Sequence, residues 1–175
     1  MRVERCSLWK RILLILCPTK SLSTPYGPAI SLDRAQAIIH AAALEVKKRD
    51  WKMNVAVVDS GGSLVAFARM DGAMLASIQI AKHKVRATAT FRRGTKVFED
   101  GVQLMQLNYL LAFVGIIASR GGTPLVEQGV IIGAIGCSGG TDSQDEIVSK
   151  ARAAVVNQVP ARSTDRDKRT ERRIP

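Results

Sequence analysis

The sequence is poor in the residues that most often bind metals, with three cysteines and two histidines in 175 residues. Structural zinc sites need four Cys or His ligands. The cysteines, Cys6, Cys17 and Cys137, show neither metal-ligand spacing nor an even-numbered disulfide framework. A histidine-rich metal site is therefore excluded, and the cysteines fit a reducing compartment, so we expect a cytoplasmic location.

Long apolar runs are also absent. The apolar run at residues 12–17 follows four basic residues, but it contains only six residues, whereas a secretory signal needs about 7 to 15. Pro18 ends the run, and no small-residue cleavage pattern follows it. No stretch approaches the roughly 20 apolar residues of a membrane-spanning helix. Export has weak support, and a membrane span has none.

Aromatic residues make up 5% of the chain, and no G-x-G-x-x-G or P-loop pattern follows a strand-like segment. The net charge is +11. Residues 1–30 carry five basic and one acidic side chain (+4), residues 31–159 carry fifteen and eleven (+4), and residues 160–175 carry six and three (+3). Most of the excess lies near the ends, and the middle has no aromatic platform for bases, so we expect no specific nucleic-acid partner.

A chain of this length has room for one core. We assign residues 1–29 to a basic N-terminal extension, residues 30–159 to one folded domain, and residues 160–175 to a basic tail. The extension and the tail lack apolar periodicity and are expected to be disordered. The domain begins with a helix capped by Ser31, whose apolar stripe is Ala35, Ile38, Ile39, Ala42 and Val46.

The middle of the domain alternates strand and helix patterns. Strands are predicted at 54–59 and 64–69 around a tight turn, followed by helices at 74–91 and 95–107. A third strand is predicted at 112–119, and a second hairpin at 125–127 and 130–138. The final helix, to Gln158, is expected to start with a capping box of Ser143 and Glu146, and its predicted apolar stripe is Ile147, Ala151, Ala154 and Val155. This order predicts an α+β fold with helices against an antiparallel sheet.

No catalytic motif stands out. Cys137 lies in an apolar strand, where burial suppresses the reactive thiolate. Each acidic candidate has a local explanation as a strand end, a turn or a cap residue: Asp59, Asp71, Asp142, Asp145 and Glu146. His40 is expected at the surface of its helix. Gly121, Gly122 and the glycines of 136–140 follow strand patterns, where they either form turns or let a ligand or another subunit approach the backbone closely.

Five collinear motifs carry a resemblance to a known family. They are N-V-A-V-V-D-S-G-G-S-L-V-A-F-A-R-M-D-G-A (54–73), F-R-R-G-T-K-V-F (91–98), R-G-G-T-P-L (120–125), G-V-I-I-G-A-I-G-C-S-G-G (129–140) and Q-D-E (144–146). Across residues 30–158 the chain resembles the GlcG/HbpS-like family, which includes the C-terminal domain of PduO-type cobalamin adenosyltransferases. The resemblance implies a profilin-like domain with a five-stranded antiparallel sheet, homo-oligomers, and haem as the cofactor of several members.

The resemblance also implies candidate haem contacts. Thr95 is the counterpart of a threonine implicated in iron coordination, although Gly94 stands where the family usually has proline. His83 competes on chemical grounds, because imidazole is a stronger iron ligand than a hydroxyl group. Lys82, Lys84, Arg92 and Arg93 either meet the haem propionates or form a solvated basic face.

Three functional hypotheses follow. The first is a protein that binds haem, a related tetrapyrrole or a small metabolite, in an accessory or sensing role and without catalysis of its own. The second is an accessory protein or enzyme of glycolate or diol catabolism or of corrinoid metabolism, with its ligand near Gly121 and Gly122. The third is a basic scaffold whose tails bind nucleic acid.

Overall fold

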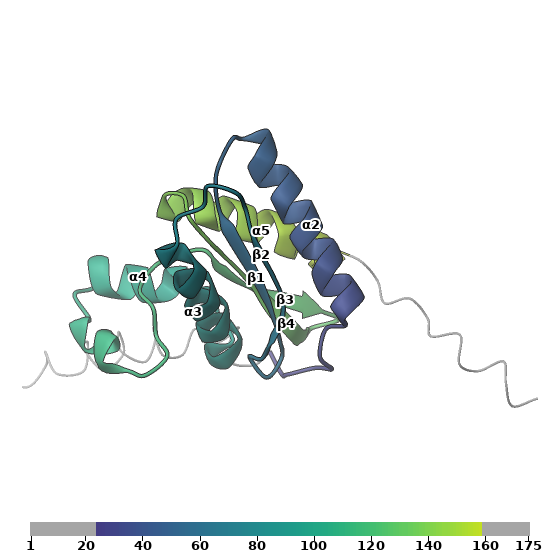
Figure 1. Ribbon diagram of the computed structural model, residues 1–175. Helices are drawn as coiled ribbons and strands as arrows, with labels where there is room; N and C mark the ends of the chain where they lie inside the picture. The colour runs from purple at the N-terminus through teal and green to yellow at the C-terminus, as the bar shows by residue number, and fades with distance from the viewer. Residues whose placement is uncertain (1–23, 159–175) are drawn as a thin grey trace, which may run out of the picture.

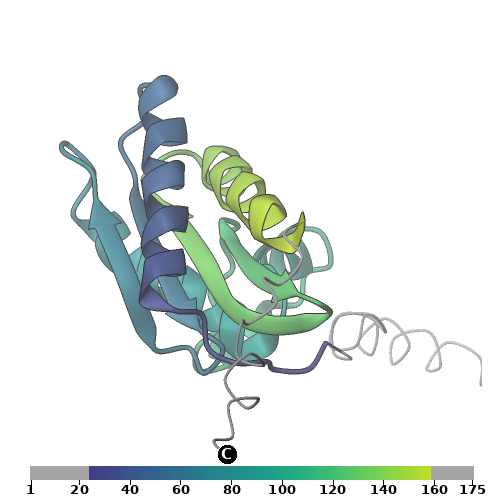
Figure 2. The same cartoon turned by 90° about the vertical axis from the view of Figure 1, so that its right-hand side faces the viewer.

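The computed structural model describes residues 24–158 and has three layers (Figure 1). The elements in chain order are α2 (Leu32–Lys48), β1 (Asn54–Asp59), β2 (Leu64–Arg69), α3 (Ala76–Phe91), α4 (Lys96–Gln103), the 3-10 helix η1 (Asn108–Ala112), β3 (Gly122–Glu127), β4 (Val130–Ser138) and α5 (Asp142–Gln158). The four strands form one antiparallel sheet in the order β2-β1-β4-β3. Helices α2 and α5 cover one face, as Figure 2 shows, and α3 covers the other. The predicted α+β class is confirmed.

Strand β1 lies at the centre of the sheet and is buried on both faces, as its nearly continuous apolar sequence predicts. Val55 and Val57 pack into the core beneath α2 and α5, while Ala56 and Val58 pack beneath α3. The α3 side is lined by small residues, so this helix lies close to the sheet. Both predicted strands of the first hairpin have the expected bounds.

Helix α2 also follows its sequence pattern. The Ser31 side chain accepts a hydrogen bond from the backbone N–H of Arg34, as an N-cap residue does. All five residues of the predicted stripe are buried. His40 is exposed, as expected.

The strand predicted at 112–119 is absent, so the described sheet has four strands and not the five that the resemblance implied. This segment instead follows η1 as a chain of turns, in which the Phe113 N–H donates to Leu110 and the Ile116 N–H donates to Phe113. Gly115 has φ +89, a left-handed conformation that interrupts an extended strand. Helices α3 and α4 are also shorter than the predicted 74–91 and 95–107.

The start of α5 differs from the prediction. The capping box is formed by Thr141 and Gln144, not by Ser143 and Glu146: the Thr141 N–H donates to Gln144 Oε1 at 2.8 Å, and the Gln144 N–H donates to Thr141 Oγ1 at 3.3 Å. The predicted apolar stripe was also wrong, since Ile147, Ala154 and Val155 are exposed. The buried positions are Asp145, Val148, Ser149, Ala153 and Val156.

Residues 24–29 were assigned to the extension, but the described part of this segment bonds to the sheet. The Gly27 N–H donates to the Ile131 carbonyl at 2.8 Å, and the Ile131 N–H donates to the Pro25 carbonyl at 2.8 Å. The Tyr26 hydroxyl donates to backbone carbonyls at the end of α3. The predictions for Cys6, Cys17, the rest of the extension and the tail from residue 160 lie outside the described residues.

Candidate functional site

Two glycines form the centre of the candidate site, where β3 begins. The Gly122 N–H donates to Thr95 Oγ1 at 3.0 Å, and the Thr95 N–H donates to the Gly122 carbonyl at 3.1 Å. Gly121 has φ +120, and a Cβ there would lie 2.7 Å from the Asp145 Cβ and 2.8 Å from the Cys137 carbonyl oxygen. The chain's own atoms therefore occupy the space beside Gly121.

A buried ion pair lies against this turn. Lys84 Nζ on α3 donates to Asp145 Oδ2 on α5 at 2.8 Å, and the two side chains are 1% and 2% exposed. The second Asp145 oxygen accepts from the Gly140 N–H at 3.1 Å. Burial raises the pKa of Asp145 to about 6, against the opposing influence of Lys84. The pair thus connects helices on opposite faces of the sheet.

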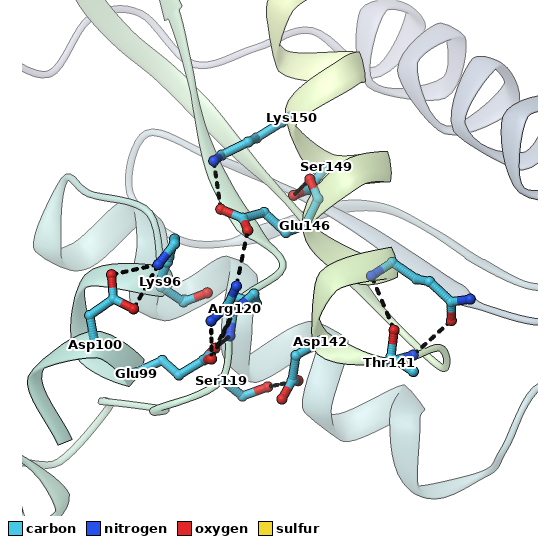
Figure 3. Close-up of polar contacts among 12 residues, drawn as sticks. Lys96, Glu99, Asp100, Ser119, Arg120, Thr141, Asp142, Glu146, Ser149 and Lys150 are labelled. Carbon is cyan, nitrogen blue, oxygen red and sulfur yellow. Dashed lines mark hydrogen bonds and ion pairs between the residues drawn. The ribbon is translucent and has the colours of Figure 1, made fainter. Parts of the chain in front are cut away.

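A second, partly exposed group of charges borders the same turn (Figure 3). Arg120 donates to Glu99 through its backbone N–H at 2.7 Å, through Nε at 2.8 Å and through Nη2 at 2.5 Å. Burial raises the pKa of Glu99, but the hydrogen bonds from Arg120 outweigh it and leave that pKa lowered. These bonds with Glu99 raise the pKa of the Arg120 guanidinium.

This charged group extends along both neighbouring helices. Arg120 also lies 3.6 Å from Glu146, which pairs with Lys150 at 2.6 Å on α5. On α4, Lys96 contacts both oxygens of Asp100 at 2.6 Å. Three cations and three anions therefore neutralise one another around this edge.

The sequence candidates are divided between two places. Thr95, Gly121 and Gly122 meet at the turn and are buried. Arg92, in the loop that precedes Thr95, lies over the Tyr26 ring at 5.4 Å and donates to the Thr24 carbonyl at 3.4 Å. His83 lies apart from this group, exposed on the outer side of α3. The structure therefore does not join His83 to the contacts of Thr95.

The basic residues near His83 do not form one solvated face. Lys84 is fully buried, and Arg93 is buried with its Nε donating to the Phe91 carbonyl at 3.2 Å. Lys82 is half-buried, with its ammonium 5.2 Å from the centre of the Phe67 ring. Lys84 is paired with Asp145, which is distant in sequence, so its interpretation as a solvated residue was wrong, while a propionate contact stays a prediction.

The sequence reasoning also missed the role of Asp145, which it explained as a cap residue. One signal was available: Lys84 falls beside the small and apolar positions Ala81, Val85 and Thr88 on the buried side of α3. A charged residue within such a stripe needs a partner of opposite charge. Asp145 is likewise a charged residue on a buried helix face, where it is the first buried position of α5.

The described residues give little support to metal-based or thiol chemistry. No group of three His, Cys, Asp or Glu residues within 24–158 is placed to hold a metal ion. Cys137 is fully buried, as predicted, and burial raises the pKa of its thiol. Within the same residues, no helix is both long and apolar enough to cross a membrane.

Comparison with known proteins identifies the family. The model of the family described as "Haem degrading protein HbpS-like" matches residues 30–154. The chain belongs to this HbpS-like family. Protein GlcG of Escherichia coli (strain K12) is 40% identical over 109 residues, which cover 62% of this chain and 81% of GlcG.

Two solved structures have folds similar to that of this chain. The crystal structure of HbpS has a TM-score of 0.69 at 26% identity, covering 77% of this chain and 95% of that one. The crystal structure of a PduOC:haem complex has a TM-score of 0.66 at 26% identity, covering 74% of this chain and 96% of that one. The match to the family model, residues 30–154, contains the turn at Gly121 and both ion pairs.

Proposed function

We propose that this chain is a cytoplasmic protein that binds haem or a related tetrapyrrole, in an accessory or sensing role. The observation that carries the proposal is the similarity to the PduOC:haem complex over 96% of that chain, within a family whose description concerns haem. Cys137 is buried and burial raises the pKa of its thiol, so this cysteine does not offer a reactive thiolate.

The two candidate iron ligands differ in their exposure to solvent. The Thr95 hydroxyl is buried and already accepts the Gly122 N–H, so coordination would break that bond or require the loop to move. The His83 imidazole is exposed and is the stronger iron ligand. We therefore propose His83 as the axial ligand and Thr95 as the residue that fixes the turn at Gly122.

A titration of hemin into the purified protein tests this proposal. The Soret band of the wild type is expected to sharpen, shift and saturate at a fixed stoichiometry. His83→Ala is expected to weaken binding about tenfold or more and to remove low-spin features, since the strong-field ligand is lost. His40→Ala is the matched control, because His40 is also exposed but lies on α2, across the sheet.

The threonine needs a separate pair of variants, because Thr95→Ala also removes the acceptor for the Gly122 N–H. Thr95→Ser keeps the hydroxyl. If His83→Ala binds hemin as the wild type does, the assignment of His83 is wrong. Loss of binding in Thr95→Ala that Thr95→Ser restores shows that the hydroxyl is needed, and a changed spectrum of the haem that Thr95→Ala still binds would assign Thr95 as the iron ligand. A wild-type protein whose Soret band never saturates would overturn haem binding itself.

A second candidate function is supported by GlcG, which is 40% identical. The family resemblance connects GlcG with glycolate-utilisation operons and the PduO-type proteins with corrinoid metabolism. A role there would place a small acid or a corrinoid near Gly121 and Gly122. If hemin does not bind, isothermal titration with glycolate and with cobalamin is the direct test of this alternative.

A further inference from the structure

Helix α3 and the loop after it carry positive charge with no acidic residue nearby in the sequence. Residues 72–98 contain six basic residues and no acidic one, whereas residues 24–158 as a whole contain fifteen basic and eleven acidic residues. Three of the six are buried or paired with an acid: Lys84, Arg93 and Lys96. The other three are at least partly exposed, and we call them the basic row: Lys82, Arg86 and Arg92.

The basic row differs from most other cations of the described surface, which pair with an acid. Within residues 24–158 no acidic side chain forms an ion pair with a member of the row. Asp59, in the turn beside Arg86, accepts the Ser63 N–H at 2.9 Å instead. Lys82 and Arg86 are also four residues apart on one helix, a spacing at which like charges destabilise the helix. Helix stability therefore does not explain the row.

Packing against the fold holds each cation of the row in place. The Lys82 ammonium lies 5.2 Å from the centre of the Phe67 ring on β2. The stem of Arg86 lies against the turn between β1 and β2, where a Cβ on Gly62 would be 3.7 Å from its Cγ. Arg92 lies over an aromatic ring in the same way as Lys82, at 5.4 Å. Side chains ordered in advance bind a partner with a smaller entropic penalty than free ones.

The spacing of the row suits a short stretch of extended chain. Ten residues of helix rise roughly 15 Å, which about five residues of an extended peptide span. Carboxylates on alternate residues of such a peptide lie on one side of it, and a guanidinium binds a carboxylate through two parallel hydrogen bonds. Nucleic acid fits less well, because cations cover a face of the aromatic rings on which bases would stack.

We propose that the basic row is a docking surface for a short acidic segment of another protein. Its unpaired cations complement the carboxylates of Asp or Glu residues, and exposed charges of this kind select the partner and speed its association. Water and salt screen an exposed surface, so the binding is weak and falls as the salt concentration rises. The proposal does not depend on haem binding.

Fluorescence anisotropy of the full chain with a labelled peptide of about ten glutamates tests the proposal at about 0.05 M salt, where exposed charges are little screened. The double variant Lys82→Glu, Arg86→Glu is expected to raise the dissociation constant at least about tenfold. The matched control is Lys47→Glu, Lys48→Glu, which changes the net charge equally on the exposed last turn of α2. The control is expected to raise it about threefold or less.

The variant Lys82→Gln, Arg86→Gln keeps long side chains without reversing the charge, and its loss should lie between wild type and the glutamate variant. Melting temperatures of all variants show whether the fold is kept. Equal losses in the row variant and the control would overturn the proposal, since net charge alone would then attract the peptide. A wild type that does not bind the peptide would also overturn it. If oligothymidylate or vesicles of anionic lipid bind more tightly than the peptide and depend on the row, the partner is not an acidic protein segment.

Discussion

The two ion pairs beside Gly121 are similar in length, but the pKa values of their acids shift in opposite directions. Lys84 lies 2.8 Å from Asp145, and Arg120 lies 2.5 Å from Glu99. Both carboxylates are buried, yet the pKa of Asp145 is raised to about 6 and that of Glu99 is lowered. The shortest distance in a pair therefore does not determine whether its acid stays charged.

The difference lies in how many donors replace the lost water. Asp145 receives one bond from an ammonium and one from the Gly140 N–H. Glu99 receives bonds to both oxygens from Arg120, whose planar guanidinium and backbone N–H act together. Arg120 is also 22% exposed, so only one member of that pair gives up most of its hydration. Lys84 and Asp145 both do, and their pair has the larger desolvation cost.

Removing one partner of the buried pair should have the largest effect. Lys84→Met leaves the Asp145 carboxylate buried without its cation, and we expect the free energy of unfolding to fall by about 3 to 5 kcal/mol. Urea denaturation monitored by circular dichroism measures this change. The shape of the side chain is nearly kept, so the loss reports the charge and not a cavity.

The control is Lys82→Met, two residues earlier on the same helix, where the ammonium lies over Phe67 and is half-buried. It should cost about 1 kcal/mol or less. Adding Asp145→Leu to Lys84→Met should recover part of the lost stability, because no charge then remains buried. If the double variant is less stable than Lys84→Met alone, the unpaired buried carboxylate is not the cause of the lost stability.

The two ion pairs should also differ in how the free energy of unfolding depends on pH. The pKa of Asp145 is raised in the fold, so its contribution to stability is fully present below its unfolded value near 3.8 and is lost as pH rises through about 6. We expect this loss to be about 1 to 3 kcal/mol between pH 4 and pH 7. Urea titrations of the wild type and Asp145→Asn across that window measure it, because the variant lacks the titration. Parallel curves would contradict the raised pKa.

The sequence predicted the parts of the fold that depend on neighbours along the chain. The stripe of α2, its Ser31 cap and the hairpin of β1 and β2 follow from local spacing and turn chemistry. The apolar run at 112–119 has the composition of a strand, but Gly115 adopts a left-handed conformation and the chain turns. Apolar composition alone does not distinguish a strand from a chain of turns.

The candidate site was harder to predict because its contacts are distant in sequence. Lys84 and Asp145 are 61 residues apart, and their pairing explains why α5 is rotated from the predicted stripe. Once Asp145 points inward, the residues three and four positions later, Val148 and Ser149, follow it into the core. Gly121 and Gly122 were recognised as places of close approach, but the chain's own side chains approach them.

Neutralising the partly exposed pair should have a smaller effect. Glu99→Gln keeps the size of the side chain but loses the charge that Arg120 contacts, and we expect a loss of about 1 to 2 kcal/mol at pH 7. Because the pKa of Glu99 is lowered, its contribution is present above the unfolded value of 4.5 and is lost as pH falls. The wild type and Glu99→Gln should therefore converge in acid. Urea midpoints at pH 7 and pH 3.5 check both statements, and a constant difference would contradict them.

The smallest effect is expected for an exposed pair with the same short distance. Lys96 lies 2.6 Å from both Asp100 oxygens, and the two side chains are 39% and 30% exposed. The lysine precedes the acid by four residues, the less favourable order on a helix, and water screens the charges. Lys96→Met should change the free energy of unfolding by about 0.5 kcal/mol or less. Denaturation at about 0.05 and 0.5 M salt should give the same difference from wild type within that range. A loss as large as that of Lys84→Met would show that distance, and not burial, determines the strength of ion pairs in this fold.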